Sequence, residues 1–349
     1  MGWRDGSDRV VCLDAATGRE IWAKSYRCPE RGRFATGDES FYRGPSSTPS
    51  FDRETRRLLT LSIDGDLCAW EAADGREAWR ANLYDSYGVG RRPRVGRQAR
   101  RDYGYTSSPL VLGGATIVEV GDDEGTLMAF STTTGRRLWS SECRDPAGHS
   151  GSPVPMTVEG LPCVAVLTLR QLLVARLDGG EEGKTLATYP WETDFANNIP
   201  TPAVQGPFVL LTTKYNHESI CKIEVTRSGA TKVWERPYAS GVCSPIIHQG
   251  RIFWISHRAY CLDFESGEIV WQGGRFGDAG SCIVTGDKKL IAWSHRGTLA
   301  LVEADRSAAA YRELARREFG AQSDVWPHVV FSLGRLYCKT REGLLTCIE

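Results

Sequence analysis

Polar, charged and aromatic side chains recur at similar places in this chain, in the segments that lead into a hydroxyl residue followed by an apolar run. Carboxylates, amides, guanidinium groups and aromatic rings bind a polar ligand, a cation or a peptide when several face one cavity. The alternative is that the Asp and Asn residues only serve turns and loop ends. The candidate ligand-binding residues are Tyr42, Arg43, Asp102, Tyr103, Tyr105, His149, Asp194, Asn197, Asn198, Arg275, Asp278, Asp324 and Trp326.

Residues 84–105 form a second candidate, because this segment contains six Arg and four Tyr. Guanidinium forks and tyrosine rings suit carboxylates, phosphates and sugar rings. A loop of this length in a compact domain is more often functional or disordered than idle. We expect Arg91, Arg92 and Arg94 to form a flap over an anion or a glycan, and the alternative is a solvated loop.

Catalytic motifs do not stand out in this sequence. The six histidines show no metal-ligand spacing, and the chain has no Cys-x-x-Cys pair, glycine-rich phosphate loop or nucleophile elbow. His257 and His295 lie in matching turns, in WISHRAY and WSHRGT, where a surface imidazole is the default interpretation. We therefore assign no catalytic residue and no metal ligand.

Five hairpins with a turn glycine and a following tryptophan organise the chain. Examples are DAATGREIW and EAADGREAW, in which glycine supplies the positive φ of the turn and the second strand carries a large aromatic side chain. We expect these aromatic side chains to wedge between neighbouring sheets. They are Trp22, Trp79, Trp139, Trp234 and Trp271.

A Ser/Thr-Pro pair lies between successive hairpins, where Pro is tolerated at the start of a strand. The pairs begin at residues 48, 108, 152, 201 and 244, with degenerate copies at 281 and 326, and most spacings match the roughly 40–50 residues of a four-stranded propeller blade. The pattern predicts one all-β domain over residues 1–349, an eight-bladed β-propeller of four-stranded antiparallel blades. In such a ring, the candidate residues converge at one mouth of a central channel.

We predict eight blades, of which the first and the last are incomplete, or seven blades if the two chain ends together form one blade. The first is the outer half of a blade, so we expect a truncated N-terminus and an export signal missing from the chain. The segment SAAAYRELARREF has helix-forming composition, but its place in the repeat favours a strand. The blades are residues 1–26, 46–83, 106–143, 150–191, 199–238, 241–273, 280–319 and 326–349.

The composition limits the classes of molecule that we expect as partners. Lys+Arg and Asp+Glu both number 43, so the formal net charge is zero, which argues against nucleic acid or an anionic membrane as the main partner. No apolar run approaches the roughly 18 residues of a transmembrane helix. We expect a monomer that binds a protein, a peptide or a glycan.

The eleven cysteines mostly indicate packing rather than disulfides. Cys12 and Cys261 occupy the slot that Ala69 and Ala129 occupy in other repeats, six residues before the turn glycine. A slot that alternates Cys and Ala is typical of a small buried site. Cys28 and Cys143, in loops between blades, form the only plausible oxidisable pair, and we predict no bond between them.

The segments LDAATGREIW and AFSTTTGRRLW resemble the PQQ-like (quinoprotein-type) propeller repeat. That repeat is shared by pyrroloquinoline quinone dehydrogenases, by the outer-membrane barrel-assembly lipoprotein propeller and by stand-alone bacterial propellers. The resemblance implies the propeller fold over nearly the whole chain and does not imply one chemistry.

Two functions follow as alternatives from the resemblance. The first is a non-catalytic, exported or periplasmic propeller without a cofactor that binds a partner at the channel mouth; a cytoplasmic location stays open. The second is an oxidoreductase that uses pyrroloquinoline quinone and calcium, for which Asp194, Asn197, Asp278 and Asp324 offer oxygen ligands. The chain lacks the adjacent Cys-Cys pair of those dehydrogenases and is shorter than they are.

Overall fold

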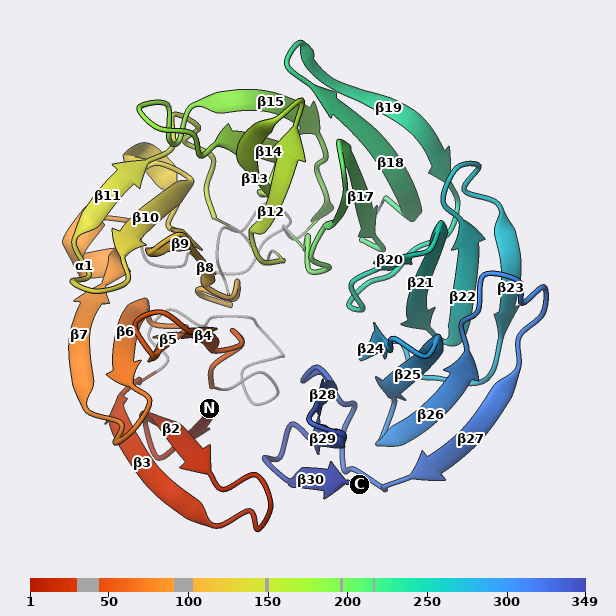
Figure 1. Ribbon diagram of the computed structural model, residues 1–349. Helices are drawn as coiled ribbons and strands as arrows, with labels where there is room; N and C mark the ends of the chain where they lie inside the picture. The colour runs from red at the N-terminus through yellow and green to blue at the C-terminus, as the bar shows by residue number, and fades with distance from the viewer. Residues whose placement is uncertain (30–43, 91–102, 148–150, 195–196, 216) are drawn as a thin grey trace. The chain divides into compact units, whose positions relative to one another are not determined.

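The computed structural model describes residues 1–29, 44–90, 103–147, 151–194, 197–215 and 217–349. In these residues, consecutive strands form eight antiparallel sheets that follow one another along the chain (Figure 1). Six sheets have four strands and two have three. The predicted fold class, an all-β propeller of eight blades, is confirmed, and the sheets are called blades 1 to 8 below.

The first compact unit comprises Met1–Asn198 and Thr226–Ala230 and contains blades 1 to 4. Blade 1 has three strands, one more than the two expected from the sequence. The strands are β1 (Gly2–Arg4), β2 (Ser7–Leu13), β3 (Glu20–Arg27); β4 (Ser50–Asp52), β5 (Arg57–Leu61), β6 (Asp66–Glu71), β7 (Glu77–Asn82); β8 (Leu110–Leu112), β9 (Ala115–Glu119), β10 (Leu127–Ser131), β11 (Arg137–Ser140); β12 (Val154–Val158), β13 (Leu161–Leu167), β14 (Gln171–Arg176) and β15 (Thr185–Pro190).

The second unit comprises Ile199–Val225 and Thr231–Glu349 and contains most of blade 5 and blades 6 to 8. Blade 8 has three strands, as predicted for an incomplete end. The strands are β16 (Ala203–Gln205), β17 (Phe208–Thr213), β18 (Ser219–Thr226), β19 (Gly229–Arg236); β20 (Ile246–His248), β21 (Arg251–Ser256), β22 (Arg258–Asp263), β23 (Ile269–Gly273); β24 (Gly280–Val284), β25 (Lys289–Ser294), β26 (Thr298–Glu303), β27 (Glu313–Glu318); β28 (Val330–Ser332), β29 (Arg335–Lys339) and β30 (Leu345–Ile348).

The Gly–Trp hairpins of blades 1 and 2 each contact the next blade. The indole Nε1 of Trp22, on β3, donates to the carbonyl oxygen of Ala72 in blade 2 at 3.0 Å. Its ring lies so close to Gly75 that a Cβ there would approach Cε3 to 2.5 Å. Trp79 repeats both contacts on blade 3, donating to Thr132 at 2.9 Å. Glycine in each turn therefore also provides the space for the indole of the preceding blade.

The small-residue slot faces the tryptophan of its own hairpin. Ala69 pairs with Trp79, and Cys261 pairs with Trp271. Both Ala69 and Cys261 are buried. A small side chain leaves room for the large ring opposite it, which explains why Cys and Ala alternate there.

The hydroxyl residue of the Ser/Thr-Pro pair links successive blades. The amide of Thr48 donates to Oγ of Ser108 at 2.8 Å, and the amide of Ser108 donates to Oγ of Ser152 at 2.9 Å. In the second unit, the amide of Thr201 donates to Oγ of Ser244 at 2.9 Å. Proline directly precedes the first strand of blades 2 to 6, so these pairs mark the starts of the blades, as predicted.

One connection and one strand differ from what local composition alone suggests. The segment expected to be loop after blade 2 begins with a short helix, α1 (Leu83–Tyr87), because the side chain of Asn82 caps it by accepting from the amide of Asp85 at 3.1 Å. Segment 307–319 contains strand β27, as the repeat predicted against its helix-forming composition. Among the described residues, no helix has the length and apolarity to cross a membrane.

Candidate functional site

The candidate site lies in the second unit, at the end of the strands where two kinds of connection meet. Strand direction alternates within an antiparallel blade. The turn from the second to the third strand therefore lies at the same end as the connection from the fourth strand to the next blade. In blade 6 the first kind of connection is the single-residue turn at His257, between β21 and β22. The second is residues 274–279, between β23 and β24.

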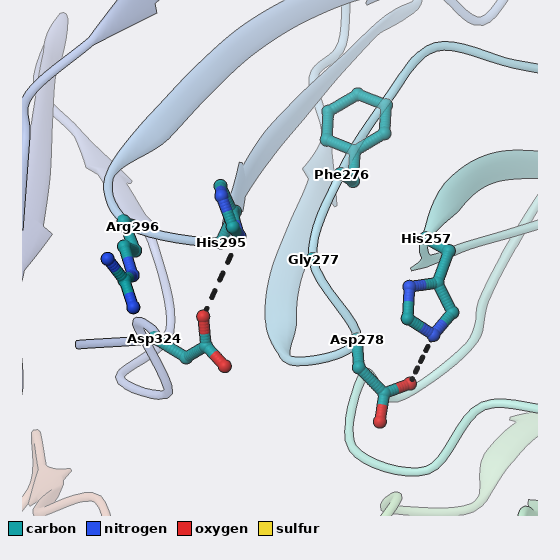
Figure 2. A pocket seen from close by; sticks show the side chains of 7 residues that line it. All are labelled: His257, Phe276, Gly277, Asp278, His295, Arg296 and Asp324. Carbon is teal, nitrogen blue, oxygen red and sulfur yellow. Dashed lines mark ion pairs between the residues drawn. The ribbon is translucent and has the colours of Figure 1, made fainter.

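His257 pairs with Asp278 across these two connections. Its Nε2 lies 3.4 Å from Oδ1 of Asp278 (Figure 2). The backbone holds the pair in place, since the amide of His257 donates to the carbonyl oxygen of Gly277 at 2.9 Å and the amide of Phe276 donates back to His257 at 2.9 Å. The two hydrogen bonds fix the turn against the connection that carries Asp278.

His295 and Asp324 repeat this arrangement one blade later. His295 follows β25 and its Nδ1 lies 3.7 Å from Oδ1 of Asp324 (Figure 2). The amide of Val325 donates to the carbonyl oxygen of His295 at 2.8 Å. His257 and His295 have positive φ angles of 55° and 53°. The two imidazole–carboxylate pairs are therefore products of the same turn in consecutive blades.

Asp278 holds more than one positively charged or hydrogen-bonding partner. Nζ of Lys214 lies 2.7 Å from Oδ1 of Asp278 and 3.3 Å from Nε2 of His257. Lys214 follows β17 and so occupies in blade 5 the position of His257 in blade 6. Oγ of Ser256 also donates to Asp278, at 3.3 Å. One carboxylate thus joins the turns of blades 5 and 6 to the connection that enters blade 7.

The turn between the second and third strands also carries a basic residue in blade 8. Arg341 lies in the turn between β29 and β30, and its guanidinium carbon is 5.9 Å from the ring centroid of Trp326. Arg296 follows His295 in blade 7 and lines the same cavity as Asp324. Basic or imidazole side chains therefore occur at the second-to-third-strand turn of four consecutive blades. We call Lys214, His257, His295, Arg296 and Arg341 the basic row.

A cavity of ≈ 500 Å³ opens between the two histidine pairs. Phe276 supplies its apolar part, and Gly277 passes so close to blade 7 that a Cβ there would lie 2.7 Å from Cα of His295. Rings, carboxylates and cations thus surround an open, mixed-polarity cavity that suits side chains of a protein or peptide. Its lining residues are His257, Phe276, Gly277, Asp278, His295, Arg296 and Asp324.

The acidic residues of this cavity, which the sequence offered as oxygen ligands for calcium, are paired with basic side chains in this structure. Calcium takes six to eight oxygen ligands, including carboxylates whose charge it neutralises. Asp278 is already paired with Lys214 and His257, and Asp324 with His295. Among the described residues, no group of three or more His, Cys, Asp and Glu side chains is arranged to hold a metal ion.

The structure brings together only part of the residue set predicted from the sequence. Asp278 and Asp324 line the same cavity, and Trp326 lies near Arg341. Arg275 belongs to the same connection as Asp278, where its carbonyl oxygen accepts from Arg316 at 3.2 Å. Residues outside the described part of the chain are Tyr42, Arg43, Asp102, His149 and the flap residues Arg91, Arg92 and Arg94.

The remaining predicted residues lie in the first unit. Tyr105 is a core residue, because its ring packs on Tyr84 and its hydroxyl donates to Val120 at 3.2 Å. Asn198 is fully buried and donates to the carbonyl oxygen of Thr168 at 2.7 Å. Burial leaves neither side chain open to a ligand, so we correct both assignments to structural ones. Tyr103, Asp194 and Asn197 are also in this unit.

Sequence reasoning placed none of the five members of the basic row in the site, namely Lys214, His257, His295, Arg296 and Arg341. The signal was present, because His257 and His295 were recognised in matching turns. The sequence predicted only surface imidazoles at these two positions. It did not show that each turn is hydrogen-bonded to the connection that carries a predicted acidic residue, Asp278 or Asp324. The repeat therefore predicted the positions, and only the geometry showed the pairing.

A family model described as "Outer membrane protein assembly factor BamB" matches residues 6–273. The chain belongs to this BamB family. The PQQ-like propeller resemblance stated from the sequence is thereby confirmed. A BamB of Xanthomonas campestris pv. campestris is 28% identical over 186 residues, which cover 46% of this chain and 44% of that protein. The match thus spans less than half of that relative's length.

Solved structures show the same fold as this BamB family member. The crystal structure of BamB from Moraxella catarrhalis matches with a TM-score of 0.63 and 11% identity, over 97% of this chain and 90% of that one. The computationally designed Ika8 protein matches with a TM-score of 0.55 and 10% identity, over 87% of this chain and 97% of that one. At these identities the likeness concerns the fold alone.

Proposed function

We propose that this chain is a non-catalytic scaffold that works without a cofactor in outer-membrane protein assembly. It binds a partner protein with the basic row and the cavity of the second unit. The observation that carries the proposal is the recurrence of the basic row in four consecutive blades, braced by Asp278 and Asp324. Membership of the BamB family and the printed name of the Xanthomonas relative support the assembly role.

The chemistry of the site favours binding over catalysis. Each imidazole faces a carboxylate, and Lys214 already satisfies the carboxylate that His257 faces. Solvent-exposed pairs of this kind contribute little to folding stability, about 0–1 kcal/mol each. They are better suited to complementary contacts with charged and polar groups of a partner, which determine specificity and association rate.

An exported location and a monomeric chain complete the proposal. The name of the relative places its work at the outer membrane, so the partner we expect is a component of the machinery that assembles outer-membrane proteins. A protein is preferred to a glycan because the row extends across several blades, whereas a small sugar would fill only one cavity.

Affinity capture from detergent-solubilised cell envelopes tests the proposal. The bait is the wild-type chain, compared with a His257→Ala/His295→Ala double variant and with Gln249→Ala. Gln249 lies at the opposite end of the same blade, in the turn between β20 and β21, so it serves as a matched control. We expect mass spectrometry to identify outer-membrane assembly proteins with wild type and Gln249→Ala, and at least tenfold less with the double variant.

Two results would count against this function. Equal capture of assembly proteins by all three baits would show that the basic row does not bind them. A rise in Tm on addition of pyrroloquinoline quinone with CaCl2, together with dye-linked oxidation of alcohols or sugars, would support the oxidoreductase alternative instead.

A further inference from the structure

Two buried thiols face each other between blades 6 and 7, in the second unit. Sγ of Cys243 lies 3.7 Å from Sγ of Cys282. Cys243 precedes β20 and Cys282 lies within β24, so 38 residues separate them in the chain. Their relative exposures are 0% and 5%, and both belong to the hydrophobic core around Trp254 and Trp271. The pair is therefore a cross-blade contact made by two cysteine side chains.

The thiol pair lies next to residues that form the hydroxyl links between other blades. Between blades 5 and 6, Oγ of Ser244 accepts from the amide of Thr201 at 2.9 Å. Between blades 7 and 8, Oγ of Ser281 accepts from the amide of Val329 at 2.9 Å. Cys243 directly precedes Ser244, and Cys282 directly follows Ser281. Between blades 6 and 7, which lie between these two links, the contact is made by Sγ of Cys243 and Sγ of Cys282.

We propose that Cys243 and Cys282 form a disulfide that joins blades 6 and 7 when the protein folds in an oxidising compartment. The two sulfur atoms are already in contact, and forming the bond requires them to move closer to the roughly 2.05 Å of a disulfide. All eleven cysteines are free thiols in this structure. The proposal does not depend on the partner-binding function.

The reaction balances with a low-molecular-weight or protein disulfide as oxidant. Cys243 loses a proton and its sulfur attacks the oxidant, forming a mixed disulfide and releasing one thiolate. Cys282 then loses its proton and attacks Sγ of Cys243, which displaces the second thiolate. Two protons and two electrons leave the protein, and the oxidant becomes two thiols. Burial restricts this exchange to the time before the strands close, or to transient opening.

When the folded protein opens transiently, local hydrogen bonds favour Cys243 as the first nucleophile. The Cys282 thiol lowers the pKa of Cys243, whereas the same contact and burial raise the pKa of Cys282 well above its ordinary value. The amide of Ile255 also donates to Sγ of Cys243, at 3.4 Å. A thiolate on Cys243 is thus the better stabilised of the two, and the thiolate is the attacking species.

The disulfide would stabilise the segments that carry His257 and Asp278 in the candidate site. Ile255, whose amide is hydrogen-bonded to Cys243, lies two residues before His257, and Cys282 lies four residues after Asp278. A covalent link here ties the segment before β20, which is hydrogen-bonded to β21 at Ile255, to strand β24, which begins after Asp278. We therefore expect the oxidised protein to have a higher Tm than the reduced protein, as closure of a loop of this length predicts.

Refolding from urea with reduced and oxidised glutathione tests the proposal, followed by alkylation, digestion and mass spectrometry. We expect an intact mass about 2 Da below that of the reduced protein. A single linked peptide pair should contain Cys243 and Cys282, and dithiothreitol should reverse the change. Cys243→Ala should lose the link, and Cys261→Ala should keep it, since Cys261 is buried in the same core.

Alkylation of all eleven cysteines in the refolded wild-type protein would overturn the proposal. Linkage of Cys243 or Cys282 to another cysteine in preference to each other would also overturn it. The peptide map of the wild-type protein decides these outcomes alone, so the test does not depend on whether Cys243→Ala folds.

Discussion

A Cβ atom on Gly75 would lie 2.5 Å from Cε3 of Trp22, although Gly75 belongs to blade 2 and Trp22 to blade 1. Gly135 has the same relationship with Cδ2 of Trp79, at 2.6 Å. The indole also donates to a backbone carbonyl of the next blade in both cases. The glycines that close these two hairpins thus also determine how closely the preceding blade can pack.

Substitution of Gly75 by Ala should therefore destabilise the protein more than substitution of Gly18. Both glycines have a φ of 70°, so Ala at either site carries the left-handed strain of about 1–2 kcal/mol. Only Gly75→Ala also overpacks against Trp22, which adds about 1–3 kcal/mol. A Cβ on Gly18 meets no atom within 4 Å. Urea unfolding measures both variants, and equal losses would refute this account of blade packing.

Removal of the Ser281 hydroxyl should cost about 1–3 kcal/mol of unfolding free energy, because it leaves the buried amide of Val329 without its acceptor. The matched change Ser108→Ala should cost less, since the amide of Thr48 that it serves is exposed to water. Denaturant midpoints of the two variants give the comparison. A larger effect at Ser108 would mean that the hydroxyl links do not stabilise the blades in the way described.

Asp8 should make stability depend on pH. It is fully buried in blade 1, where burial raises the pKa of its carboxyl to about 7, and Tyr26 donates to Oδ2 at 3.1 Å. Titratable groups that contribute to the pKa of Asp8 include the Cys28 thiol, Asp64 and Asp66. The folded protein prefers protonated Asp8. Its contribution to the free energy of unfolding is therefore fully present below pH 3.8 and is lost as the pH rises through about 7.

Asp8→Asn should remove this dependence and should be more stable than wild type at pH 8, by on the order of 2–4 kcal/mol. Thermal unfolding between pH 4 and 8 measures how the stability of wild type and Asp8→Asn depends on pH. Asp5→Asn is the control at an exposed carboxylate. Parallel curves for wild type and Asp8→Asn would contradict the assignment.

Asp278→Ala separates a binding role from a structural one. The Asp278 side chain is 49% exposed, so loss of its contacts with Lys214 and His257 should change the unfolding free energy by less than about 1 kcal/mol. Capture of assembly proteins should nevertheless fall, because Lys214 and His257 lose the group that positions them. Asp287→Ala, at an exposed turn between β24 and β25, is the control. A large loss of stability with unchanged capture would make Asp278 a structural residue.

Much of the fold was predictable because the repeat carries it. Segment 307–319 has helix-forming composition, yet β27 forms there because the preceding strand β26 needs a partner, as the repeat implied. Helix α1 was not predicted, since its cap on Asn82 depends on a single side-chain contact that leaves no mark in the repeat. Long-range periodicity thus predicted the blades better than local composition did.

The site was less predictable, because its contacts join different blades. Asp278 and Asp324 were expected from their place before a blade, but their partners Lys214, His257 and His295 are far from them in the sequence. Tyr105 was expected at a surface and instead fills the core beside Tyr84. The thiol contact of Cys243 and Cys282 also escaped the sequence, because a buried cysteine slot resembles any small packing site.

Site-specific photocrosslinking tests the partner-binding account most directly. A photoreactive amino acid replaces His257 in one protein and Gln249 in another; both positions have positive φ, 55° and 49°, and they lie at opposite ends of blade 6. After irradiation in living cells, the account predicts a crosslink from position 257 to an outer-membrane assembly protein and none from position 249. A crosslink to such a protein from position 249 alone, or equal crosslinks from both, would contradict it.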